Sequence, residues 1–108
     1  MANTFINATL KATTSGSLDT IYTTPAATTT LIHGLFISNV GDTTLKVDLK
    51  MLDASAETTS SLLTRGKILP GSTLVWDKPI NLETLDSIRL APDRNNSTEI
   101  VASVLQIT

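Results

Sequence analysis

Residues 44–52 read Thr-Leu-Lys-Val-Asp-Leu-Lys-Met-Leu, in which apolar and polar side chains alternate with a period of two. The apolar positions are Leu45, Val47, Leu49 and Met51, and the polar positions between them are Lys46, Asp48 and Lys50. In an extended chain successive side chains point to opposite faces, so this stretch has one apolar face and one polar face. The pattern predicts an antiparallel strand with one buried face and one face in water.

The same alternation recurs more weakly at residues 72–77 and 87–91. Turn-forming residues separate these runs at intervals of roughly 8–12 residues, which is typical of a sandwich or barrel. Pro70-Gly71 predicts a type II turn, because Pro presets φ and Gly accepts a positive φ. Residues 53–63 are the only stretch whose pattern admits a helical turn.

These patterns together predict an all-β fold: a two-sheet antiparallel β-sandwich of eight or nine short strands, with jelly-roll or immunoglobulin-like topology. The 108 residues suffice for one domain, which we expect to span residues 13–108. Residues 1–12 are expected to form an N-terminal strand or arm that can add to the sheet edge of a neighbouring molecule. The 19 threonines favour strands whose outer faces carry hydroxyl groups.

Two segments are apolar on both faces, namely residues 29–40 and 99–107. In the first segment, strict alternation places Leu31, Leu35 and Ile37 on one face and Ile32, Phe36 and Val40 on the other. Gly34 inside this segment indicates a β-bulge or the close approach of another backbone. A chain of this length has little material for a second covering layer, so the excess apolar surface predicts a protein–protein interface. The predicted interface residues are Phe5, Ile6, Leu31, His33, Leu35, Ile37, Val101, Leu105 and Ile107.

The residues that carry chemistry in other proteins are few and isolated in this chain. His33 is the only histidine, and no nucleophile or orienting residue accompanies it in a recognisable motif. Residues 93–96 lack the acidic spacing and the closing Glu of a calcium loop, and they favour an Asx-rich hairpin instead. Cysteine is absent, so thiolate ligands and disulfides are excluded. We therefore expect no catalytic residues, no metal, no cofactor and no enzymatic activity.

The charge pattern bears on the partners that the chain can have. The formal net charge is −2, and the eight Lys and Arg residues form no run along the sequence, which predicts that nucleic acid is not a partner. No stretch approaches the roughly 18 apolar residues of a membrane span, and residues 1–14 lack the features of a signal peptide. We expect assembly in the cytoplasm without membrane contact.

Two stretches resemble a family of roughly 100-residue proteins from tailed-phage structural gene clusters. Residues 21–41 read IYTTPAATTTLIHGLFISNVG, and residues 68–90 read ILPGSTLVWDKPINLETLDSIRL, followed after a loop by EIVASVLQI at 99–107. The similar features are a Y-T-x-P-A turn, a long strand ending in Ser-Asn, a P-G-S-T-L turn, an L-x-x-x-D-S-I corner and a C-terminal strand. Thr84-Leu85 departs from the Ala-Gly expected at the corner. The resemblance implies a β-sandwich virion protein without catalytic residues.

The leading functional expectation is a capsid decoration (cement) protein or a comparable accessory protein of a tailed-phage virion, assembled in the bacterial host cytoplasm. Its partners would be other virion proteins, either capsid or tail subunits, and further copies of itself as a homo-oligomer. A structural protein of the tail, neck or baseplate is the close alternative. A carbohydrate-binding or fibre-tip adhesin domain is the alternative from a different class.

Overall fold

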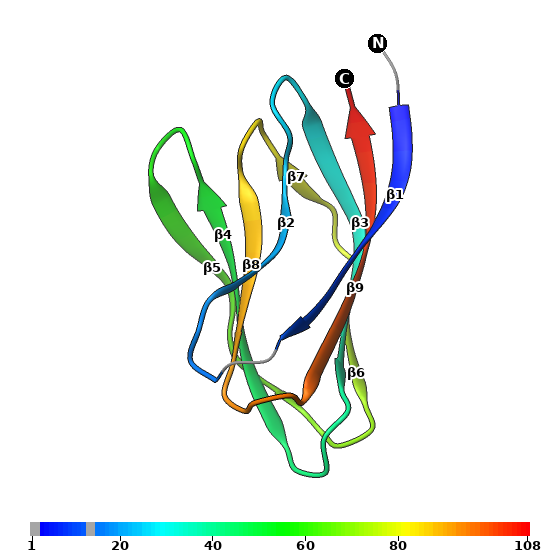
Figure 1. Ribbon diagram of the computed structural model, residues 1–108, viewed down its shortest axis with the longest axis vertical. Helices are drawn as coiled ribbons and strands as arrows, with labels where there is room; N and C mark the ends of the chain where they lie inside the picture. The colour runs from blue at the N-terminus through cyan, green and yellow to red at the C-terminus, as the bar shows by residue number, and fades with distance from the viewer. Residues whose placement is uncertain (1–2, 13–14) are drawn as a thin grey trace.

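The chain folds into two antiparallel β-sheets packed face to face, as the computed structural model shows for residues 3–12 and 15–108 (Figure 1). The predicted all-β sandwich is confirmed, and the described residues contain nine strands. The strands are β1 Asn3–Ala12, β2 Asp19–Thr23, β3 Thr29–Asn39, β4 Leu45–Asp53, β5 Thr58–Ile68, β6 Thr73–Trp76, β7 Ile80–Leu82, β8 Ser87–Pro92 and β9 Thr98–Ile107.

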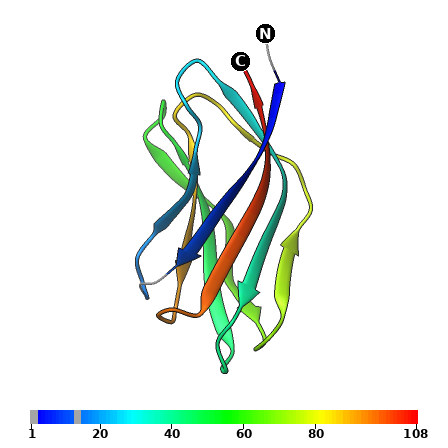
Figure 2. The ribbon, with the colours of Figure 1, turned by 45° about the vertical axis from the view of Figure 1, so that its right-hand side comes forward.

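One sheet has five strands and the other has four. The five-stranded sheet has the order β1-β9-β3-β6, and β7 pairs with β3 beside β6, so two short strands share one edge of β3 (Figure 2). The four-stranded sheet has the order β2-β8-β4-β5. No helix among the described residues is long and apolar enough to cross a membrane.

The predicted alternation of β4 is confirmed by burial. Leu45, Val47 and Leu49 are at most 1% exposed and pack in the core between the sheets. Ile88 and Leu90 of β8 are fully buried beside them. Residues 53–63 form a turn and the start of β5 instead of a helix, because Thr58 to Leu63 pair with β4.

The expected faces of β3 are wrong for its first half, and the reason is a β-bulge. Along β9, Ile32 pairs with Val104 and Gly34 pairs with Ser103, so His33 is the extra residue. One extra residue exchanges the two faces of a strand. Ile32 is therefore fully buried with Leu35, whereas Leu31 lies on the outer face.

The N-terminal strand β1 lies at the edge of the five-stranded sheet of its own chain. It pairs with β9 from Asn3 to Ala12, and its inward side chains Ile6, Ala8 and Leu10 pack against the core. The expected domain boundary at residue 13 lies outside the described residues.

Two of the turns contain the motif residues identified in the sequence. Ser72 N–H donates to the Leu69 carbonyl at 3.0 Å, and Gly71 has a φ of 74°, as the predicted type II turn requires. Asn39, at the end of β3, is 1% exposed. Its amide donates to the carbonyls of Thr43 and Ile68 and its oxygen accepts from Gly41 N–H, so this buried side chain is satisfied on every side.

Candidate interaction surfaces

The outer face of the five-stranded sheet carries two apolar rows that cross its strands. The β-sheet register places Phe5, Leu105 and Leu31 side by side in the first row. The second row runs across β9, β3 and β6 through Val101, Phe36 and Val75. We call these six residues, together with His33 and Ile107, the apolar face.

Several side chains of the apolar face remain in contact with solvent. Phe5 is 73% exposed, Val75 56%, Val101 43% and Phe36 40%. Val101 and Phe36 lie on neighbouring strands near the middle of the sheet, so their exposure is not caused by a fraying edge. A row of exposed apolar side chains on a paired sheet is typical of a surface that another molecule covers.

The β3 bulge organises the centre of the apolar face. It turns His33 outward, where the imidazole stacks on the Phe5 ring with a centroid distance of 5.7 Å and an interplanar angle of 24°. Gly34 leaves space beside it, and two ring atoms of Phe36 lie 3.7 and 3.8 Å from the position that a Cβ of Gly34 would take. A hollow of about 220 Å³ lies between Phe5, His33 and Ser103.

The structure brings six of the nine predicted interface residues onto the apolar face and removes the other three. Leu35 and Ile37 are fully buried in the core, so neither is available to a partner. Ile6 points inward from β1 and packs against the core. The residues that reach the apolar face are Phe5, Leu31, His33, Val101, Leu105 and Ile107.

Phe36 and Val75 also belong to the apolar face, although they are not among the nine predicted interface residues. The alternation of residues 72–77 places Val75 and Trp76 on opposite faces of the strand, so the outward position of Val75 could be predicted from the sequence. Phe36 could be assigned to the outer face only with the position of the bulge, which exchanges the faces of β3.

Trp76 and the polar loop at residues 93–96, which the sequence suggested as possible ligand-binding residues, have contacts that stabilise the fold. Trp76 is half-buried against the core, and its Nε1 has no hydrogen-bond partner among the described residues. In the loop at residues 93–96, Asp93 Oδ1 accepts from Lys46 N–H at 2.9 Å and Asn95 Oδ1 accepts from Ser15 N–H at 2.6 Å. These oxygens therefore hold neighbouring loops and strands together, as in the predicted Asx-rich hairpin.

The outer face of the four-stranded sheet has a different character. Lys46, Lys50 and Asp48 point outward from β4, as predicted. The register places Lys67 of β5 opposite Lys46, and Arg89 of β8 opposite Lys50. We call the outward cations of this sheet the basic face, which consists of Lys46, Lys50, Arg65, Lys67 and Arg89.

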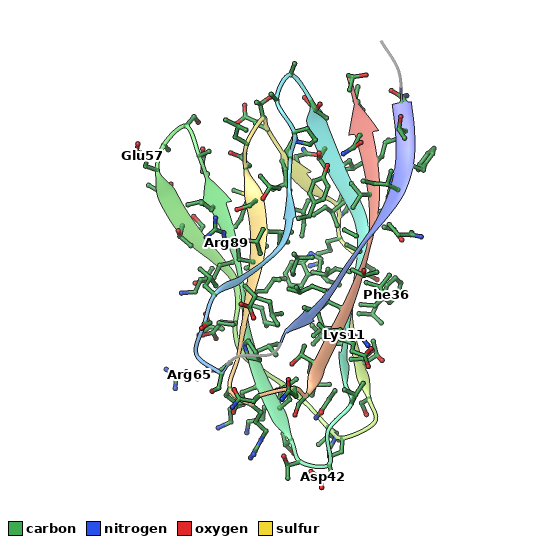
Figure 3. The ribbon with its side chains drawn as sticks, viewed as in Figure 1. Lys11, Phe36, Asp42, Glu57, Arg65 and Arg89 are labelled. Atoms are coloured by element: carbon green, nitrogen blue, oxygen red, sulfur yellow. The ribbon has the colours of Figure 1, made fainter. Side chains whose placement is uncertain are left out.

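Arg65 reaches the basic face through an irregularity of β5. The pairing of β4 and β5 shifts between Val47 and Leu49, and Arg65 there has a positive φ of 51°. Its N–H donates to Asp48 Oδ1 at 2.7 Å, which stabilises this uncommon backbone conformation. Arg65, Lys46 and Asp48 line a hollow of about 310 Å³ with Asp93 on the same side of the sandwich. Figure 3 shows Arg65 and Phe36 on opposite sides of the molecule.

The sequence matches no protein-family model and no curated protein. Among solved structures, the fold is similar to a chain of infectious bursal disease virus, Gx strain, with a TM-score of 0.52 and 10% identity over 95% of this chain and 32% of that chain. A chain of the Gt strain gives a TM-score of 0.48 and 9% identity over 98% of this chain and 30% of that chain.

Another similar structure is the CBM22-1–GH10 part of xylanase 10B from Clostridium thermocellum in complex with xylohexaose. It gives a TM-score of 0.45 and 11% identity over 96% of this chain and 24% of that chain. The chain spans about a third or less of the length of all three structures. At these identities the likeness concerns the β-sandwich fold, which this chain shares with part of a virus structure.

Proposed function

We propose that this chain is a non-enzymatic structural protein of a tailed-phage virion, and specifically a capsid decoration protein that binds neighbouring protein subunits through its apolar face. The observation that carries the proposal is the pair of apolar rows on the outer face of the five-stranded sheet. The resemblance of the turn and strand motifs to small tailed-phage proteins supports the virion assignment. The β-sandwich fold shared with a virus structure is compatible with it.

The size of the exposed aromatic side chains favours a protein partner. A Phe side chain buries on the order of 200 Å² when covered, so covering a side chain as exposed as Phe5 contributes about 3 kcal/mol at ~25 cal/mol per Å². Exposed aromatic and aliphatic side chains surrounded by polar residues are the usual composition of the centre of a protein–protein interface. Asn7, Lys11 and Glu99 supply such polar surroundings here.

Val101→Lys is expected to weaken association of the purified chain at least tenfold while leaving the free energy of unfolding within about 1 kcal/mol. Val101 is 43% exposed at the centre of the apolar face, so an added ammonium group stays hydrated in the free chain and loses its water only when a partner covers it. Light scattering and sedimentation measure the association, and urea denaturation measures the stability. Thr43→Lys adds the same charge to an exposed position of the β3–β4 loop, outside the apolar face and the basic face, and is expected to leave association unchanged.

A monomeric wild-type chain that also fails to bind purified particles would contradict the proposal. The number of copies in purified particles then distinguishes the positions: hundreds of copies support capsid decoration, whereas a multiple of six or twelve favours the tail, neck or baseplate. Binding to host glycans by a chain with no affinity for particles would instead favour the carbohydrate-binding alternative.

A further inference from the structure

The fold gathers some of the charged residues, which are scattered along the sequence, into two regions. The basic face contains five of the eight Lys and Arg residues of the chain. At one end of the molecule, the last residue of β4, the β4–β5 turn and the β7–β8 loop carry carboxylates and no Lys or Arg. We call these carboxylates, Asp53, Glu57, Glu83 and Asp86, the acidic end. Figure 3 shows Glu57 at the upper end of the molecule, Arg65 toward the lower end and Arg89 between them.

Four cations of the basic face form two directly opposed pairs, and the nearby Asp48 accepts from the backbone N–H of Arg65. Lys46 is directly opposite Lys67, and Lys50 is directly opposite Arg89. Like charges opposite each other on neighbouring strands destabilise a sheet. An ion pair joins Lys11 and Glu99 on the other sheet, at 3.5 Å. In the isolated chain these opposed cations therefore repel each other, and an anionic group bound between them would reduce the repulsion.

The acidic end is held rigid by one buried carboxylate. Asp86 is 3% exposed, and its two oxygens accept from Ala54 N–H at 3.0 Å and from Glu83 N–H at 2.9 Å. These bonds fix the β4–β5 turn beside the β7–β8 loop, while the side chains of Glu57 and Glu83 remain exposed. The Ser55 hydroxyl and the Ala56 N–H lower the pKa of Asp53, so this carboxylate is ionised at neutral pH.

We propose that the basic face of one copy binds the acidic end of a second copy, so that the chain associates head to tail. The occupant is a second copy because this chain itself supplies the complementary carboxylates on a rigid end. A long polyanion such as nucleic acid fits less well, because the net charge is −2 and Asp48 and Asp93 lie beside Lys46. A head-to-tail contact uses different surfaces on the two copies, so it either closes into a ring or continues as a chain.

This contact is independent of the apolar face. The basic face belongs to the four-stranded sheet and the apolar face to the five-stranded sheet, so one copy can engage both at once. Exposed ion pairs contribute about 0–1 kcal/mol each, so several are needed and the contact is weak at high salt. Apolar contacts, in contrast, are not weakened by salt.

The test compares two charge-reversed variants of the full chain by sedimentation velocity at 0.05 M and 1 M NaCl. Lys46→Glu/Lys67→Glu changes the basic face, and Glu57→Lys/Glu83→Lys changes the acidic end; all four side chains are exposed. The wild-type chain is expected to associate more strongly at low salt than at high salt. For each variant alone, the association constant at low salt is expected to be at least tenfold lower than that of the wild type. An equimolar mixture of the two is expected to regain it, because the reversed surfaces are complementary.

Lys78→Glu/Arg94→Glu serves as the control, since it alters the net charge by the same amount as Lys46→Glu/Lys67→Glu, at exposed positions outside both the basic face and the apolar face. This control is expected to keep the salt-sensitive association.

Three results would each overturn the proposal: wild-type association that does not depend on salt, an equal loss of association in the control, or a mixture of the two variants that stays dissociated. Binding of a duplex oligonucleotide that Lys46→Glu/Lys67→Glu abolishes, without self-association, would overturn it in favour of nucleic acid. Val101→Lys distinguishes the charged contact from the apolar contact. It changes only the apolar face, so it is expected to keep the salt-sensitive association.

Discussion

Leu35→Ala is expected to lower the free energy of unfolding by about 2–5 kcal/mol, whereas Leu31→Ala lowers it by about 1 kcal/mol or less. Strict alternation would place the two leucines on the same face and predict similar effects. The bulge at His33 separates them: Leu35 is fully buried between the sheets, and Leu31 lies on the apolar face. Truncating Leu35 removes apolar contacts and leaves a cavity in the core.

Urea denaturation of both variants measures this difference. The slope of unfolding free energy against urea concentration should stay unchanged, since both chains expose the same surface on unfolding. Equal destabilisation by the two substitutions would show that the bulge is absent and that the two positions share a face. Leu31→Ala is also expected to weaken association, because Leu31 belongs to the apolar face.

Asp86→Ala is expected to lower the free energy of unfolding by about 2–4 kcal/mol, because it leaves the N–H groups of Ala54 and Glu83 without their acceptors. Both bonds are to a carboxylate in a buried position, where the loss of one partner costs the most. The substitution also loosens the β4–β5 turn relative to the β7–β8 loop. Increased amide hydrogen exchange at these two segments should accompany the loss of stability.

Asp93→Ala is the matched control for this prediction. Asp93 also accepts a backbone N–H bond, from Lys46 at 2.9 Å, but its side chain is exposed. Water can replace that acceptor, so the expected loss is below about 1 kcal/mol. A loss at Asp86 no greater than the loss at Asp93 would contradict the structural role assigned to the buried carboxylate.

The strands could be predicted where the alternation is local and uninterrupted. In β4, burial follows the sequence pattern from Leu45 to Leu49, because each side chain is placed by the strand's own pleat. In β3, Gly34 indicated the irregularity, but which residue is inserted depends on the pairing with β9. The faces of Leu31 and Phe36 therefore depended on a partner strand more than sixty residues away.

The charged surfaces could not be predicted for the same reason. Lys46 and Lys67 are separated by twenty residues in the sequence, and only the β4–β5 register places them opposite each other. Asp86 gave no sign of its buried position, since carboxylates in turns are usually exposed.

The divided edge of the five-stranded sheet has a consequence for fibre formation. β6 has four residues and β7 has three, and the connection between them contains Pro79, which has no N–H to donate. A foreign strand therefore meets no long uninterrupted row of free backbone groups along this side. Amyloid-like growth from this edge is disfavoured, so many copies of the chain can accumulate at high local concentration with this side protected.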